Sequence, residues 1–300
     1  MKLHLRQTFN RWRRHRLWLV VCLVVVVLVG TAGAEADGVI LAYNVEQGML
    51  SHLVLRTKEE VVQEVNGQEV KREEEFLLEY EFAKQEDAEG AYVARLVSLQ
   101  YREATPFQVL AYDSAAEADH APELGFYKTL PGITAEVSVS RNALIFTCDS
   151  STFPKDEEAR SWSLRDILRL IDRDVQKQNV ALICGNAFIN YPDRPLPVGA
   201  VWQQPVRIVL RHGTVYNDTG TYYIDEIEEE TIVLKYSSRA NFISLQSLLA
   251  GELSGEVVLD RASGLPLEGK IDAVFAGEVE RLGLAVPVTM KMSMEFAARF

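Results

Sequence analysis

The histidines and serines are the side chains of this sequence best suited to nucleophilic catalysis. After residue 34 the chain holds three histidines, His52, His120 and His212. The Gly-x-Ser-x-Gly turn that exposes a catalytic serine is absent from the sequence, and so are the glycine-rich loops that bind phosphates. A triad can still assemble from residues far apart in the chain, so a hydrolase remains the third and weakest functional hypothesis.

One acidic segment contains the residue types of a metal site, namely Asp113, Glu117, Asp119, His120 and Glu123. Metal ligands must converge on one point, and a calcium loop needs a glycine to turn sharply. This segment has no such glycine, so we expect a solvated acidic loop. The sequence therefore predicts neither a metal site nor a cofactor.

Near the C-terminus, six apolar residues alternate with more polar ones, as expected for a strand with one buried face. Methionine is flexible and polarizable, and it suits surfaces that adapt to varied apolar partners. The functional hypothesis is the wall of a cavity for an acyl chain or a similar ligand, and the commoner explanation is an ordinary core face. The residues of this apolar stripe are Val286, Val288, Met290, Met292, Met294 and Phe296.

Residues 1–34 have the order of a secretory signal peptide: six basic residues, an uncharged apolar run and the small residues Ala32 and Ala34. The alternative is an uncleaved membrane anchor over residues 17–34. Both interpretations place the rest of the chain outside the cytoplasm, in the periplasm or secreted, or anchored to the cytoplasmic membrane. The membrane would then be contacted only through residues 1–34.

Charge excludes one class of partner. The formal net charge is −12, and it becomes −18 once the six basic residues of the leader are removed. Such a surface repels phosphate backbones, so we expect no nucleic-acid partner.

In an exported chain, Cys148 and Cys184 could form a disulfide. Two buried free thiols remain the alternative.

Most of the remaining sequence predicts antiparallel strands. Asn66-Gly67 is a strong signal for a two-residue hairpin turn, and residues 69–82 alternate apolar and acidic side chains. Further strands are expected at 92–101, 134–146, 202–211, 222–228, 231–236, 255–260, 267–276 and 285–296. A turn is expected near Asn217-Asp218, and irregular or helical inserts at 103–131 and 240–251.

One amphipathic helix is predicted to start at Ser163, because Ser163 and Asp166 suit its N-terminus. Its apolar stripe is Leu164, Ile167, Leu168, Ile171 and Val175. A stretch with three prolines, Tyr191 to Trp202, follows as an extended linker.

An internal duplication is indicated by two matching pairs of segments, Gly48–Leu50 with Gly199–Trp202 and Glu136–Arg141 with Glu256–Arg261. The predicted fold class is α+β, mainly β. It comprises two unequal antiparallel repeats like half-barrels, connected by one amphipathic helix. The expected divisions are 1–34, 35–150, 151–198 and 199–300.

Several of these residues resemble an uncharacterised family of exported bacterial β-rich proteins. The shared features are Pro192, Pro195, Gly199 and Trp202, the opening Tyr43-Asn44 with Gly48 and Asn66-Gly67, and the closing Gly255, Leu259, Asp260 and Gly264. The resemblance implies export but no activity. At the level of the fold, the order of elements is also similar to envelope half-barrels that hold lipid.

The leading hypothesis is therefore an exported, non-enzymatic envelope or extracellular protein that binds an apolar, acyl-chain-like ligand. The alternative from another class is a structural or assembly partner of another envelope protein.

Overall fold

The computed structural model describes residues 38–44, 51–65, 67–85, 91–116, 124, 127, 130–147, 188–210, 213–244, 247–281 and 284–299. The leader, the helix expected at Ser163 and both cysteines of the expected disulfide lie outside these residues. Every described strand belongs to one compact unit, Ile40–Phe300. Within the described residues, no helix is both long enough and apolar enough to cross a membrane.

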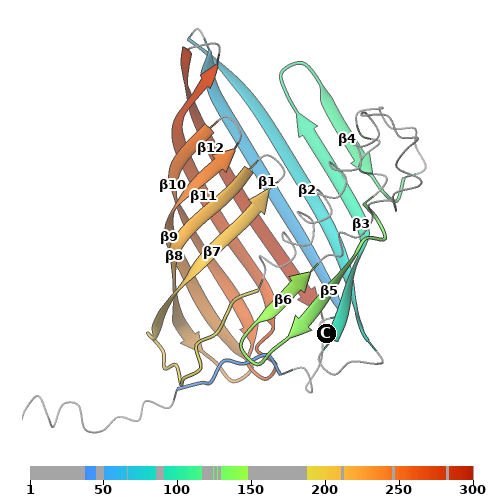
Figure 1. The fold of residues 1–300 in the computed structure, drawn as a ribbon, viewed down its shortest axis with the longest axis vertical. Helices are drawn as coiled ribbons and strands as arrows, with labels where there is room; N and C mark the ends of the chain where they lie inside the picture. The colour runs from blue at the N-terminus through green and yellow to red at the C-terminus, as the bar shows by residue number, and fades with distance from the viewer. Residues whose placement is uncertain are drawn as a thin grey trace, which may run out of the picture. The chain divides into compact units, whose positions relative to one another are not determined.

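The fold is a single open antiparallel sheet, which confirms the prediction of a mainly β protein (Figure 1). Its order is β6-β5-β3-β2-β1-β12-β11-β10-β9-β8-β7, and β4 pairs with β3 outside this path. The strands are β1 (His52–Val65), β2 (Gln68–Lys84), β3 (Ala91–Ala104), β4 (Val109–Asp113), β5 (Thr134–Val139), β6 (Leu144–Thr147), β7 (Val201–Leu210), β8 (Gly213–Ile227), β9 (Thr231–Ser244), β10 (Ser247–Asp260), β11 (Pro266–Arg281) and β12 (Leu284–Arg299).

The two predicted repeats meet inside this sheet. β1, near the start of the described chain, pairs along most of its length with β12, from His52↔Arg299 to Gln63↔Val288. Strands of residues 35–150 and strands of residues 199–300 therefore share one hydrogen-bonded ladder. The division into two repeats stays a prediction within that sheet.

Several strands follow the period-two pattern closely. β2 and β12 cover the expected ranges 69–82 and 285–296. The expected hairpin joins β1 to β2, since Val65 pairs with Gln68 and Gly67 has a positive φ of 72°. Only a residue that tolerates this left-handed backbone fits such a turn easily.

Four local predictions were wrong. The irregular or helical insert expected at 103–131 contains a strand, β4, which pairs with β3. The insert expected at 240–251 is strand, because Ala240, Phe242 and Leu249 alternate with exposed residues and complete β9 and β10. The turn expected near Asn217 lies inside β8, where the register against β9 shifts between Tyr216 and Thr221. The strand expected at 134–146 is the hairpin of β5 and β6.

The core lies on one face of the sheet, which we call the buried face. Strand register aligns its side chains in rows that run across the strands. One row reads Leu234, Val257, Gly269, Phe296, Leu55 and Leu78, on β9, β10, β11, β12, β1 and β2. Gly269 makes room in this row, because a Cβ there would lie 2.4 Å from the Phe296 ring. Gly251 makes room for the Phe275 ring in the same way, because a Cβ at Gly251 would lie 2.6 Å from that ring.

Candidate functional site

The apolar stripe of β12 lies on the buried face, as its alternation predicted. Val286 is half-buried and the other five residues are buried, each at most 7% exposed. Of the intervening residues, Pro287 and Lys291 are exposed and Glu295 is half-buried. The stripe therefore lies on the face that its alternation indicates, and its role as a ligand-binding wall stays a prediction.

The three methionines of the stripe have different neighbours in their rows. Met290 lies between Phe275 of β11 and Val61 of β1. Met294 lies between Ile271 and Thr57. The direct neighbours of both methionines are apolar, apart from the threonine hydroxyl, and the Met290 row reaches Arg72 of β2 one strand beyond Val61. Met292 is different, because its direct neighbour on β1 is charged.

A charged cluster follows Met292 on the same buried face. Glu59 of β1 is the cross-strand neighbour of Met292, and Glu74 of β2 is the next residue of the row. Arg72 Nη2 lies 3.0 Å from Glu59 Oε1 and 4.0 Å from Glu74 Oε2. Glu74 is only 5% exposed, and a carboxylate this buried requires compensating contacts. The buried face therefore has an apolar region bordered by paired charges.

The row of Met294 continues through Ile271 and Gly255 to β9, β8 and β7, where it ends in three aromatic rings. Trp202 of β7, Tyr222 of β8 and Tyr236 of β9 are consecutive cross-strand neighbours. The Trp202 and Tyr222 rings stack at 5.5 Å, and the Tyr222 and Tyr236 rings lie 4.8 Å apart. Burial raises the pKa of Tyr222 well above its ordinary value, so its hydroxyl stays neutral. We call Trp202, Tyr222 and Tyr236 the aromatic wall.

The proline-rich stretch and the opening segment pack together against the loop before β11. Tyr43 and Tyr191 lie with ring centroids 4.8 Å apart. The Tyr43 hydroxyl donates to the Ile189 carbonyl at 2.7 Å, and the Tyr191 hydroxyl donates to the Gly264 carbonyl at 2.7 Å. Burial raises the pKa of both tyrosines. The expected linker is therefore anchored to the unit by its buried residues Tyr191, Leu196 and Trp202, while most residues between them are exposed.

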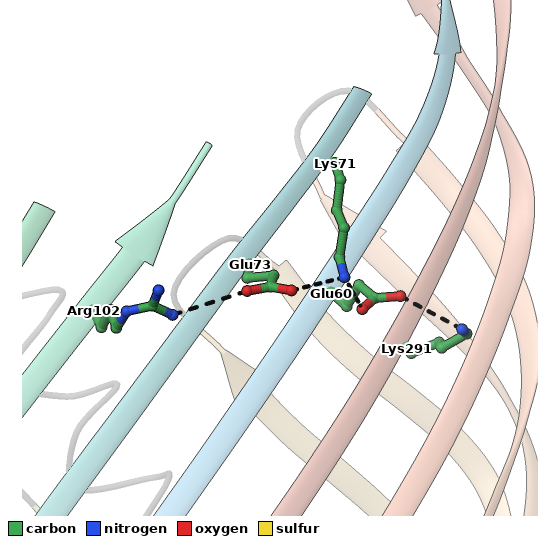
Figure 2. Close-up of polar contacts among 5 residues, drawn as sticks. All are labelled: Glu60, Lys71, Glu73, Arg102 and Lys291. Carbon is green, nitrogen blue, oxygen red and sulfur yellow. Dashed lines mark hydrogen bonds and ion pairs between the residues drawn. The ribbon is translucent and has the colours of Figure 1, made fainter. Parts of the chain in front are cut away.

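The opposite face of the sheet is exposed and polar. Figure 2 shows a chain of ion pairs across β3, β2, β1 and β12, from Arg102 through Glu73, Lys71 and Glu60 to Lys291. Lys71 Nζ lies 2.7 Å from a carboxylate oxygen of both Glu60 and Glu73. A hollow of about 460 Å³ is lined mostly by residues of this face, among them Lys58, Arg102 and Lys291. Surface ion pairs of this kind contribute little individually, and here they link four neighbouring strands in one register.

Of the other candidate residues, the structure describes only His52 and Asp113. His52 lies in β1 with Glu81 and Arg299 as cross-strand neighbours. Asp113 accepts a hydrogen bond from the Ala115 N–H at 2.9 Å, which stabilises a turn. His120, His212 and the other acidic residues of 113–123 lie outside the described residues. Among the residues that the structure describes, no three His, Cys, Asp or Glu side chains gather as metal ligands would.

Sequence reasoning missed the charged cluster and the aromatic wall. A run of three acidic residues such as Glu73-Glu74-Glu75 is typical of a hydrated strand surface, yet Glu74 is buried while its neighbours are partly exposed. Alternation places every second residue of such a run on the same face, and that signal could have identified Glu74. The partners Glu59 and Arg72 follow only from the register of β1 with β2.

Comparison with known proteins gives no family. No family model matches the chain, and no curated protein matches it. Among solved structures, lipovitellin, described for its lipid–protein interactions, gives a TM-score of 0.47 at 6% identity over 84% of this chain. The match spans only 25% of the lipovitellin chain.

Two bacterial structures give weaker matches. An outer membrane channel from Pseudomonas putida F1 gives a TM-score of 0.21 at 7% identity, covering 89% of this chain and 100% of the channel. A DUF1329 family protein from Desulfovibrio piger gives 0.13 at 8% identity, covering 84% of this chain and 86% of that chain. Function must therefore be argued from the geometry of the sheet itself.

Proposed function

We propose that this protein is a non-enzymatic binding protein of the cell envelope or extracellular space, and that it holds an apolar, chain-like ligand against the buried face. The observation that carries the proposal is the amphipathic pattern of that face. Apolar rows around Met290 and Met294 adjoin the paired charges of Glu59, Arg72 and Glu74. An apolar chain with a polar end needs both kinds of surface.

Methionine supports this function in a specific way. Its side chain has no branch and its sulfur is polarizable, so it can change rotamer to fit chains of different shape at low cost. Three methionines follow one another on one face of β12. Met292 is the methionine with the smallest neighbour in its row, Ala273 of β11.

The test is a fluorescence titration of the full-length protein with 11-(dansylamino)undecanoic acid. We expect saturable binding, with an increase in dansyl emission as the probe leaves water. Met292→Gln conserves the shape of the side chain but places an amide where the chain would lie. An amide that loses its hydrogen bonds costs about 1–3 kcal/mol, which weakens binding roughly fivefold or more.

Glu295→Gln is the matched control, because it puts the same amide on the exposed face of the same strand. It should bind the probe like the unaltered protein. Thermal unfolding of each variant checks that the sheet is intact. The proposal fails if the unaltered protein shows no saturable binding, or if both variants weaken binding equally.

A further inference from the structure

Two buried polar atoms of β7 have no hydrogen-bond partner among the described residues. They are Trp202 Nε1 and Gln204 Oε1. Trp202 is only 8% exposed. An indole N–H or an amide oxygen left unpaired in the interior costs about 1–3 kcal/mol, so each such pair of atoms in a folded protein requires an explanation. Trp202 and Gln204 are alternate residues of one strand and therefore share a face.

Tyr222 brings these two side chains together. The Trp202 ring stacks on the Tyr222 ring at an interplanar angle of 15°. Burial raises the pKa of the Tyr222 phenol, and a smaller effect in the opposite sense comes from its hydrogen bond with the Gln204 side chain. The Gln204 amide oxygen is left as an acceptor, next to a tyrosine that stays neutral because it is buried.

The chemistry of the two atoms selects a partner. Trp202 Nε1 can only donate a hydrogen bond, and Gln204 Oε1 can only accept one. A carboxylate would satisfy the indole and repel the amide oxygen, and an ammonium group would do the reverse. A hydroxyl satisfies both, because it accepts from the indole and donates to the amide. A neutral hydroxyl, whether of a ligand or of a water molecule, is thus the smallest group that completes this pair.

This pair lies at the end of the row that contains the aromatic wall. The row runs Trp202, Tyr222, Tyr236, Gly255, Ile271 and Met294. Five steps between neighbouring strands separate β7 from β12, and at 4.7–4.9 Å per step they span roughly 24 Å. That distance suits a long hydrocarbon chain which reaches the methionines with one end at Trp202.

We infer that the apolar ligand of the proposed function ends in a neutral hydroxyl, which binds between Trp202 Nε1 and Gln204 Oε1. The inference rests on the proposed function and names the chemical class of its ligand, a long-chain alcohol or a molecule with an equivalent hydroxyl end. The aromatic wall then positions the first part of the chain, and the stripe of β12 holds the rest.

The test is competition for the bound dansyl probe on the full-length protein. 1-Hexadecanol, hexadecyl methyl ether and hexadecanoate have matched chains and differ at the end. The alcohol can use both protein atoms. The ether can accept from Trp202 but cannot donate to Gln204, and hexadecanoate is repelled by the amide oxygen. We expect the alcohol to displace the probe at roughly fivefold to tenfold lower concentration than either competitor, the effect of one hydrogen bond.

Two variants separate the two contacts. Trp202→Phe keeps an aromatic ring without the N–H, and it should weaken the alcohol and the ether alike. Gln204→Met keeps the length of the side chain without the acceptor, and it should weaken the alcohol alone. Gln203→Met is the matched control, because Gln203 is on the exposed face of the same strand and should behave like the unaltered protein.

The possible failures are distinguishable. If the probe binds but the alcohol and the ether compete equally, the hydroxyl inference is wrong and the proposed function stands. The same holds if Gln204→Met and Gln203→Met give equal displacement curves. If the probe does not bind, the proposed function fails and the inference fails with it. Unfolding temperatures of all variants show whether a lost effect is merely a lost fold.

Discussion

At the scale of single residues, buried tyrosine hydroxyls connect segments that are distant in the sequence. The hydroxyl of Tyr43 donates to the Ile189 carbonyl and also accepts from the Ile189 N–H at 3.1 Å. It therefore holds the opening segment to the proline-rich stretch, 146 residues away. A cross-link of this range acts on the folded unit as a whole.

Tyr43→Phe should destabilise the protein by about 1–2 kcal/mol, because the Ile189 N–H and carbonyl then lose a buried partner. Urea unfolding followed by circular dichroism measures this change. Tyr223→Phe is the control, since Tyr223 is half-buried on the other face of β8. Equal unfolding midpoints for the two variants would show that the Tyr43 hydroxyl contributes nothing.

The ion pairs of the exposed face predict that the stability of the fold falls at acidic pH. The hydrogen bond from Lys71 lowers the pKa of Glu60 below its usual 4.5. The unfolded chain therefore binds this proton at a higher pH than the folded chain does. Glu60 therefore stabilises the folded state above about pH 4.5, and this stabilisation is lost as the pH falls through the lower pKa of the folded state.

Below about pH 4.5, the free energy of unfolding should fall less steeply with acidification in Glu60→Gln than in the unaltered protein. Urea unfolding at a series of pH values, at low and at high salt, gives the slope of the unfolding free energy against pH. The difference between variant and unaltered protein should shrink in high salt, because exposed pairs are screened. A slope unchanged by the substitution would mean that the Lys71 contact does not persist in solution.

At the scale of elements, alternation was enough to predict strands but not their partners. β2 and β12 were predicted because bulky apolar residues alternate with charged ones. Residues 240–251 were missed because Ala240, Gly251 and several serines give weak alternation, and a sheet neighbour supplies the packing instead. Gly251, for example, is covered by the Phe275 ring of β11.

The candidate site also has one part that a single strand predicts and other parts that depend on strand pairing. The stripe of β12 is a property of one strand, and it was predicted with the correct face. The charged cluster and the aromatic wall each combine several strands, and their assembly depends on register. Hairpin turns fix the register of neighbouring strands, but nothing local indicates that β12 pairs with β1.

The turn before β11 depends on a glycine. Gly264 has a φ of +69°, and a Cβ there would lie 2.2 Å from the Ala42 carbonyl oxygen. Gly264→Ala should therefore cost more than left-handed backbone strain alone. Gly132→Ala is the control, since Gly132 has a φ of +88° with no atom near the added Cβ.

Thermal unfolding of both variants measures the difference. We expect Gly264→Ala to lower the midpoint clearly more than Gly132→Ala, because backbone atoms cannot move aside as a flexible side chain can. Similar midpoints would indicate that the segment around Ala42 can move away from Gly264 with little loss of stability, and that the hydrogen bond from Asn44 to Ser263 is weak.

At the scale of the whole described unit, one sheet contains both predicted repeats. If the sheet unfolds cooperatively, β1, β12 and β11 at its centre should show the slowest amide exchange, and β6 and β7 at its edges the fastest. Hydrogen exchange with peptide-level mass spectrometry tests this expectation. Weak protection at the β1–β12 pairing, with strong protection on either side, would instead support two repeats that fold separately.

The pairing of β1 with β12 also constrains how the protein is made. β1 is synthesised early, and its ladder partner emerges from the ribosome more than two hundred residues later. Until then one side of β1 presents unsatisfied amide and carbonyl groups, an edge to which other chains can add. The middle of the sheet is therefore completed last, and the nascent polypeptide must be shielded from aggregation until synthesis has reached β12.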